Sequence, residues 1–196
     1  MQITDELRRA VRLVALLNLG YFGVEFAVAL TIGSVSLFAD SIDFLEDASL
    51  NLLILAALGW SELNRARVGI VLAGILLVPG LATLWAVWEK LHSQVPPQPV
   101  ALSLTGLGAL AVNASCAFIL ARHRHHGGSL TRAAFLSSRN DVAANIAIIA
   151  AGIVTAYTLS IWPDIIVGLG IFSLNIGAAR EVYVVARKEH AIARIE

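Results

Sequence analysis

The sequence predicts an all-α membrane protein with six transmembrane helices, both termini in the cytoplasm, and an inverted repeat of three helices. Three observations support this fold class. Hydrophobic residues make up 58% of the chain and charged residues only 14%, with a mean hydropathy of +0.77, whereas about a quarter of the residues in a soluble domain are charged. Apolar stretches of membrane-spanning length recur six times, and Lys and Arg gather in alternate connections between them.

A helix needs about 20 residues to cross about 30 Å of hydrocarbon, and six segments reach this length. They are residues 11–32, 34–58, 68–88, 99–121, 130–157 and 163–185. The connections are short, so residues 1–196 are expected to form a single transmembrane domain with no soluble C-terminal domain. The start of the chain lacks a small-residue cleavage site after a short apolar core, so the first span is not expected to be a removed signal peptide.

The positive-inside rule sets the predicted orientation. With both termini in the cytoplasm, nearly all Lys and Arg residues lie on the inside, Lys90 alone lies outside, and Arg139 and Arg180 fall within spans. This pattern predicts a multi-pass protein of the cell membrane, as in a prokaryotic inner or plasma membrane, with the lipid bilayer as its surroundings. The formal net charge is zero, and nothing in the chain indicates a nucleic-acid partner.

The second and fifth spans carry matching polar stripes, because residues four apart lie on one face of a helix. The second reads D-x-x-x-D-x-x-x-N and the fifth S-x-x-x-D-x-x-x-N. Their residues are Asp43, Asp47 and Asn51, and Ser137, Asp141 and Asn145. The two spans run in opposite directions, as an inverted repeat requires, and such repeats place substrate sites near the bilayer midplane where the halves meet.

Three aspartates at midplane depth need a partner, because an ionised Asp at the centre of a membrane helix costs a few kcal/mol on insertion scales. Protonation, a water-filled cavity or a bound cation could supply it, and a divalent metal ion satisfies the group best. Two other interpretations stay open: a structural polar cluster, or an outer loop formed by "FADSIDFLED". A span that began beyond Asp47 would be too short to cross the membrane.

Further charged residues extend this pattern. Asp40 lies close to the same helix face, where it lines an ion path or hydrogen-bonds a neighbouring helix, and Glu25 in the first span is a candidate for the same ion or proton path. Glu46 and Arg139 are a candidate ion pair between the second and fifth spans, with Arg139 in a cytoplasmic water cavity as the alternative. Asp164 is expected to cap the sixth helix.

The loop "RHRHHGG" invites a second interpretation, because imidazole is the commonest metal ligand. Its histidines are His123, His125 and His126. They would collect metal ions on the inside, or the loop is simply the short basic connection that the predicted topology requires.

The stretches "LNLGYFGVEFAVALTIGSVSLFADSIDFLED" and "FLSSRNDVAANIAIIAAG" resemble the cation diffusion facilitator family, whose members are metal-ion/proton antiporters that export zinc and related divalent cations. The resemblance implies metal ligands at Asp43 and Asp47 in the second helix and at Ser137 and Asp141 in the fifth. Family members usually carry His where this chain has Ser137, and a cytoplasmic domain after the sixth helix.

A non-enzymatic efflux transporter is therefore expected, which exchanges a divalent cation for protons and needs no bound cofactor. Three carboxylates, with Asn145 or water as a fourth partner, form an oxygen-only site that suits Mn²⁺ or Mg²⁺, whereas zinc favours nitrogen or sulfur. Zinc, iron, cobalt and cadmium stay open, as does a homodimer. The alternatives are a transport-incompetent membrane scaffold or regulatory subunit that retains the fold, and an intramembrane enzyme that uses the carboxylates as acid and base.

Overall fold

The structure is a computed structural model that describes residues 5–56, 81–122 and 128–174. These residues contain six helical segments and no strand, which confirms the predicted all-α class. Four helices are long: α1 (Asp5–Ile32), α2 (Val35–Ala56), α4 (Pro99–Ala121) and α5 (Gly128–Thr158). The other two segments are 81–93 and Trp162–Leu174. The rest of the predicted third and sixth spans lies outside the described residues.

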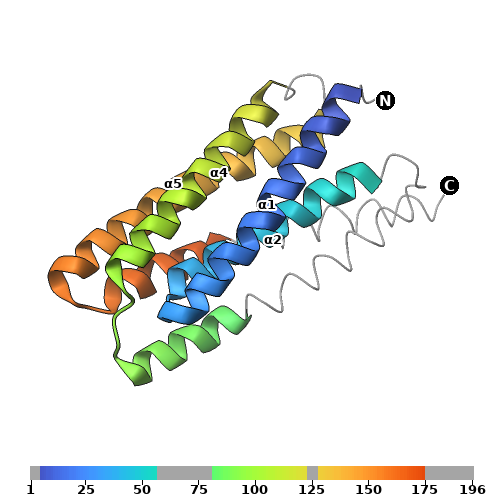
Figure 1. Ribbon diagram of the computed structural model, residues 1–196. Helices are drawn as coiled ribbons and strands as arrows, with labels where there is room; N and C mark the ends of the chain where they lie inside the picture. Colours follow the sequence, from blue (N-terminus) through green and yellow to red (C-terminus); the bar gives the residue numbers. More distant parts are fainter. Residues whose placement is uncertain (1–4, 57–80, 123–127, 175–196) are drawn as a thin grey trace.

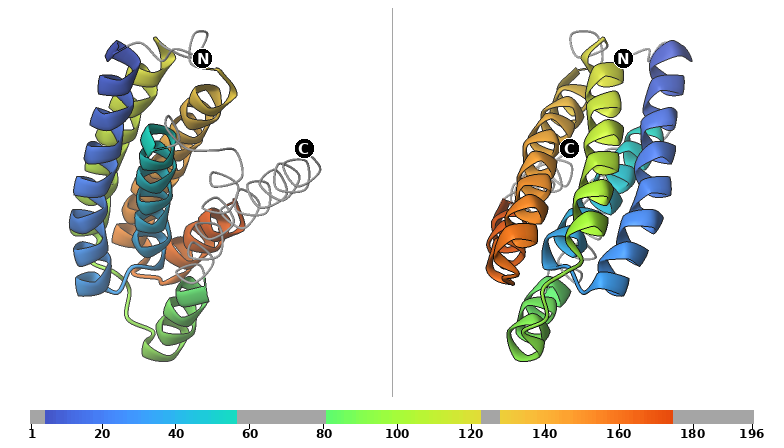
Figure 2. Two further views of the ribbon diagram at one scale, coloured as in Figure 1. Left: turned by 90° about the vertical axis from the view of Figure 1, so that its right-hand side faces the viewer. Right: turned by 60° about the vertical axis from the view of Figure 1, so that its left-hand side comes forward.

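The four long helices form a ring in which α1 packs on α2, α2 on α5, α5 on α4 and α4 on α1. Figure 1 and Figure 2 show that α1 and α2 make one antiparallel pair and α4 and α5 the other. The N-terminus of α1, the end of α4 and the start of α5 lie at one end of the ring. The connections after α1 and α5 lie at the opposite end, together with segment 81–93 (Figure 1).

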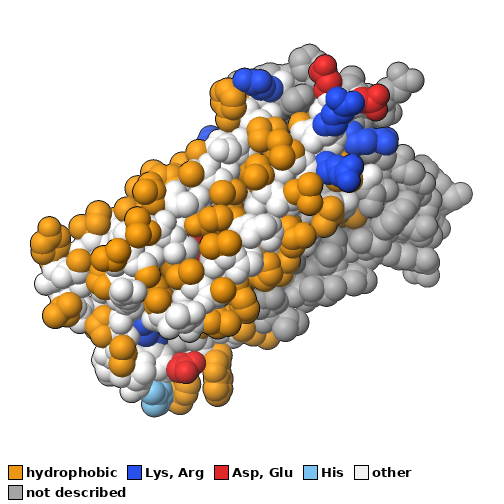
Figure 3. Space-filling view, in the orientation of Figure 1, with side chains coloured by type: hydrophobic (Ala, Val, Ile, Leu, Met, Phe, Trp, Pro, Cys, Tyr) orange, Lys and Arg blue, Asp and Glu red, His pale blue; other side chains and the backbone are white. Residues whose placement is uncertain are grey.

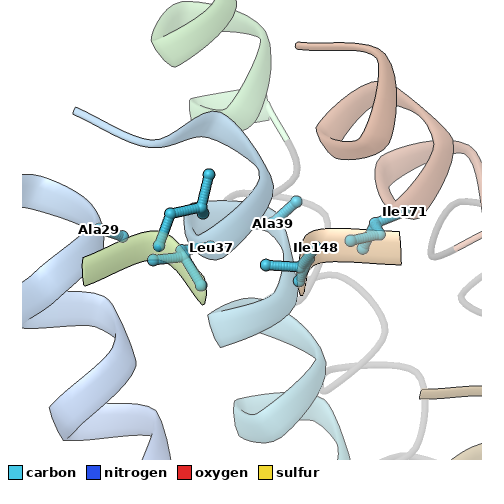
Figure 4. Packing of buried hydrophobic residues seen from close by; sticks show 6 residues of the cluster. Ala29, Leu37, Ala39, Ile148 and Ile171 are labelled. Carbon is cyan, nitrogen blue, oxygen red and sulfur yellow. The ribbon is translucent and has the colours of Figure 1, made fainter. Parts of the chain in front are cut away.

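The ring has an apolar core to which all four long helices contribute. Leu37, Leu102 and Ile148 are completely buried there, and Ile171 from segment Trp162–Leu174 packs against them (Figure 4). Small residues allow close approach: a Cβ on Gly168 would lie 2.7 Å from Cγ1 of Val35. Segment Trp162–Leu174 is thereby fixed against the start of α2.

The outer surface of the ring is apolar. Leu16, Leu104 and Phe118 are 57%, 63% and 62% exposed, and monomeric soluble proteins rarely expose such continuous apolar surface. Figure 3 shows a band of hydrophobic side chains across the middle and Lys and Arg gathered toward the end that holds the N-terminus. The protein is an integral membrane protein, and its orientation stays a prediction.

Three helices of the described part are long and apolar enough to cross a membrane: Asp5–Ile32, Pro99–Ala121 and Ser138–Thr158. α2 is not among them because its 22 residues include four carboxylates, although it lies alongside α1 in the ring. The count of six spans therefore stays a prediction for the whole chain.

The turn between α1 and α2 is held by Asp164, which comes from a helix about 130 positions further along the chain. Gly33 has a φ of +60°, a conformation that glycine adopts without strain, and α2 starts two residues later. Asp164 accepts hydrogen bonds from the backbone N–H groups of Val35 and Ser36 at 2.8 and 3.1 Å. It also accepts from the hydroxyls of Ser34 and Ser36, at 2.7 and 2.6 Å.

Asp164 was expected to cap its own helix, and the structure corrects this expectation. The carboxylate instead satisfies the first N–H groups of α2, where the helix dipole favours negative charge. Lys90 of segment 81–93 completes the joint: its Nζ donates to the carbonyl oxygen of Gly33 at 2.6 Å and lies 4.0 Å from Oδ2 of Asp164. Three separate segments therefore meet at this end of the ring.

Candidate functional site

The polar residues of α2 and α5 face each other across the ring at three levels. At the first, Nδ2 of Asn145 donates to Oδ2 of Asp40 at 2.6 Å. At the second, the carboxyl groups of Asp43 and Asp141 interact electrostatically. The levels follow from helix geometry, because steps of three to four residues along two antiparallel helices return to the shared face.

At the third level, Oγ of Ser138 donates to Oδ2 of Asp47 at 3.4 Å. Asp141 is close enough to Asp47 to interact with it as well, so Asp43, Asp47 and Asp141 lie near one another. Asp47 is 4% exposed, whereas Asp43 and Asp141 are partly exposed. Of the two predicted polar stripes, the structure brings the aspartates Asp43, Asp47 and Asp141 together.

The described residues contain no group of three His, Cys, Asp or Glu side chains that could hold a metal ion as they stand. The spacing along α2 accounts for this. Asp43 and Asp47 are one helical turn apart, about 6 Å along the axis. A cation bound by Asp43, Asp47 and Asp141 would therefore require these side chains to converge through changes of rotamer.

Asn145 has a role in the structure that differs from the expected ligand role. Its Nδ2 donates to Asp40, and its Oδ1 accepts from Nδ2 of Asn113 in α4 at 3.0 Å. A carboxylate can only accept, which fixes the orientation of the Asn145 amide. Its oxygen is directed to α4, so Asn145 positions Asp40.

The position expected to carry a fourth ligand, Ser137, lies in α5, but its side chain is outside the described residues. Its neighbour Ser138 is completely buried and contacts Asp47. Ser137 was selected from the sequence because it lies four residues before Asp141, and Ser138 was not considered. His123, His125 and His126 also lie outside the described residues.

The candidate ion pair between Glu46 and Arg139 is not formed. Glu46 is 8% exposed and Arg139 is exposed, and no ion pair joins them. Arg139 lies two residues before Asp141, which turns it about 200° away from the inner face. Glu46 instead interacts electrostatically with Asp47.

Glu25 of α1 lies beside Asp40, and both side chains are completely buried. The two carboxyl groups are within hydrogen-bonding reach of each other. No donor reaches either oxygen of Glu25 or Oδ1 of Asp40. The ion path expected at these two residues thus corresponds to a closed, buried pair in this conformation.

Sequence reasoning missed Asn113 and Ser138, which both support the aspartates. A signal for Asn113 was present: it is the one Asn in the apolar span 99–121, and polar side chains inside membrane helices usually have partners. Ser138 gives no comparable signal, because Ser is common on both faces of membrane helices.

Two comparisons bear on this site. The family model described as the cation efflux transmembrane domain matches residues 11–188, which includes all the acidic residues of α1, α2 and α5 described above. Among curated proteins, no match to the chain was found.

Proposed function

Because the chain belongs to the cation efflux family, we propose that it exports a divalent metal cation from the cytoplasm in exchange for protons. The family is one of cation transporters. The observation that carries the finer proposal is the meeting of Asp43, Asp47 and Asp141 between the antiparallel helices α2 and α5. Carboxylates gathered inside a membrane domain mark ion pathways.

The proposed cargo site consists of Asp43, Asp47 and Asp141. Ser137 is the further candidate, and water would complete the shell. Such a site offers only oxygen ligands, which favour Mn²⁺ or Mg²⁺ over Zn²⁺. Zinc, iron, cobalt and cadmium are the other candidates, and they would bind more weakly or in another geometry.

Proton exchange follows from the chemistry of carboxyl ligands. A metal ion binds to the deprotonated groups, so binding releases protons and protonation releases the metal. Protons that enter from the outside would free the cation there, and the proton gradient would drive export.

The test is a flux assay in proteoliposomes with an imposed pH gradient and a panel of divalent cations. Wild type should transport at least one cation, and Asp47→Ala and Asp141→Ala should each abolish saturable transport. Glu89→Gln is the matched control, because it removes an exposed carboxylate outside the ring. Wild-type transport by both alanine variants would contradict the site assignment.

The pH dependence tests the exchange separately. Metal affinity should rise with pH between about 5.5 and 8, because protons compete with the metal for the carboxylates, and binding should acidify a weak buffer. A flat affinity profile without proton release would remove proton exchange from the proposal and leave metal binding.

A second candidate function is a membrane scaffold or regulatory subunit that no longer transports. The absence of a ready metal site among the described residues favours it, as does the serine at position 137. This candidate requires that wild type neither binds nor transports any cation of the panel.

A further inference from the structure

The pair formed by Glu25 and Asp40 adjoins the three aspartates of the proposed cargo site and interacts electrostatically with them, but it lies on a different helix pair. Glu25 belongs to α1, whereas the cargo site lies between α2 and α5, and Asp40 is three residues before Asp43. Both members of the pair have 0% exposure. The pair therefore occupies a second closed position between α1 and α2.

The pair lacks a donor in the protein. Asp40 has one oxygen, Oδ2, held by Asn145, but its Oδ1 and both oxygens of Glu25 have no hydrogen-bond partner. Ionised carboxylates only accept, so two of them in contact need a positive charge or a proton between them.

The nearest hydroxyl does not meet this need. Tyr21 is close enough to Glu25 and Asp40 to interact with both, yet its hydroxyl donates to the carbonyl oxygen of Thr105 at 2.6 Å. A tyrosine has one proton to donate. The proton of the Tyr21 hydroxyl is therefore engaged by Thr105 and is not available to the pair.

No basic side chain of the described residues supplies a positive charge to the pair either. Within the described ranges, no Lys or Arg forms an ion pair with Glu25 or Asp40, and the ion pair present, Lys90 with Asp164, lies at the end of the ring. A buried charge without a partner costs several kcal/mol. One divalent cation at the cargo site carries two positive charges against three aspartates, so it leaves nothing for this pair.

We propose that Glu25 and Asp40 form a second cation-binding position, which holds one positive charge between α1 and α2. The shared chemistry is a small cation bound by two buried carboxyl groups, with Tyr21 as an oxygen neighbour and Asn145 as the group that orients Asp40. The charge comes from one of two sources, a proton or a second ion of the cargo metal. The identity of that metal rests on the proposed function.

The experiment uses the full-length protein in detergent with Mn²⁺ as the probe, and it compares wild type, Glu25→Gln, Asp40→Asn and the control Glu89→Gln. The infrared band of protonated carboxyl groups is recorded without metal, and the number of Mn²⁺ ions bound is measured by equilibrium dialysis. The infrared measurement needs no metal, so it reports on the pair even if wild type binds no Mn²⁺.

If the charge is a proton, Glu25→Gln loses carboxyl absorption equivalent to one group, and Asp40→Asn shifts or removes the same band. If it is a metal ion, each of the two variants binds one Mn²⁺ fewer than wild type and Glu89→Gln. Unchanged spectra and unchanged stoichiometry in both variants would overturn the proposal.

If the proposed transport function is wrong, the result differs: wild type binds no Mn²⁺, and its infrared spectrum still reports on the pair. Because Glu25→Gln could also fold poorly, Glu25→Asp is included, which keeps the carboxyl group and shortens the side chain. It should restore either the band or the second ion if the carboxyl group itself is what matters.

Discussion

Asp164→Ala should strongly destabilise the protein, because this one side chain joins three segments. It removes the acceptor for four donors, two backbone N–H groups and two hydroxyls. It also leaves the charge of Lys90, 4% exposed, with the Gly33 carbonyl alone. Each buried donor left without an acceptor costs about 1–3 kcal/mol, and because four donors are affected we expect a loss of about 3–5 kcal/mol.

Two further variants separate the contribution of the hydrogen bonds from that of the ion pair. Asp164→Asn keeps one oxygen acceptor but loses the charge. Hydrogen bonds to a charged group contribute about 1.5–3 kcal/mol each, so we expect Asp164→Asn to lower the free energy of unfolding by about 1.5 kcal/mol. Lys90→Met leaves the four donors of Asp164 satisfied. The ion pair is long, at 4.0 Å, so this variant should cost only about 1 kcal/mol.

The effect should also depend on pH. Burial lowers the pKa of Lys90 below its usual 10.5, and the charge of Asp164 opposes that shift. Without Asp164 the pKa of Lys90 in the folded protein falls further, so the unfolded state binds more protons between that pKa and 10.5. Stability rises with pH wherever the unfolded state binds more protons, so the deficit of Asp164→Ala should shrink as pH rises.

The assay is equilibrium unfolding by sodium dodecyl sulfate in mixed micelles, followed by circular dichroism. Glu89→Gln is the control, since this exposed residue should change stability by no more than about 0.5 kcal/mol. A loss below about 1 kcal/mol for Asp164→Ala would refute the assignment, because even one unsatisfied buried donor costs that much.

Three other substitutions test the interior of the ring. Asn113→Ala leaves a buried amide oxygen on α5 without its donor and should cost about 1–2 kcal/mol, as measured in the same micelles. Gly108→Ala places a Cβ against the hydroxyl of Tyr21 and should cost about 1–3 kcal/mol through overpacking, whereas Gly20→Ala, which meets no atom within 4 Å, should not destabilise. Ser137→His adds a nitrogen ligand one turn from Asp141 and should shift preference toward Zn²⁺ over Mn²⁺, as competition binding would reveal; an unchanged order would mean that position 137 faces away from the site.

The sequence was sufficient for features that repeat along a single helix. Apolar composition and span length predicted the membrane helices, and 99–121 coincides with α4. The four-residue spacing of Asp43 and Asp47 placed both on one face of α2 because helical periodicity is a property of the local chain. The antiparallel partner α5 was predictable from its matching polar stripe together with the alternating direction of the predicted spans.

The tertiary structure decided which side chains meet across helices. Glu46 and Arg139 were a reasonable pair by charge, yet the rotation of α5 turns Arg139 outward. Asp164 caps a helix that begins far away in the sequence. Such contacts depend on the rotation and depth of each helix, which close packing at residues such as Gly168 fixes.

By itself, then, the sequence determined that carboxylates lie inside a membrane domain and which helix faces carry them. Only the tertiary structure decided that Asn145 holds Asp40 and that Glu25 lies against Asp40 without a donor. The physical reason is that periodicity is set by hydrogen bonds within each helix, whereas partners across helices depend on how side chains from distant segments fill the same volume.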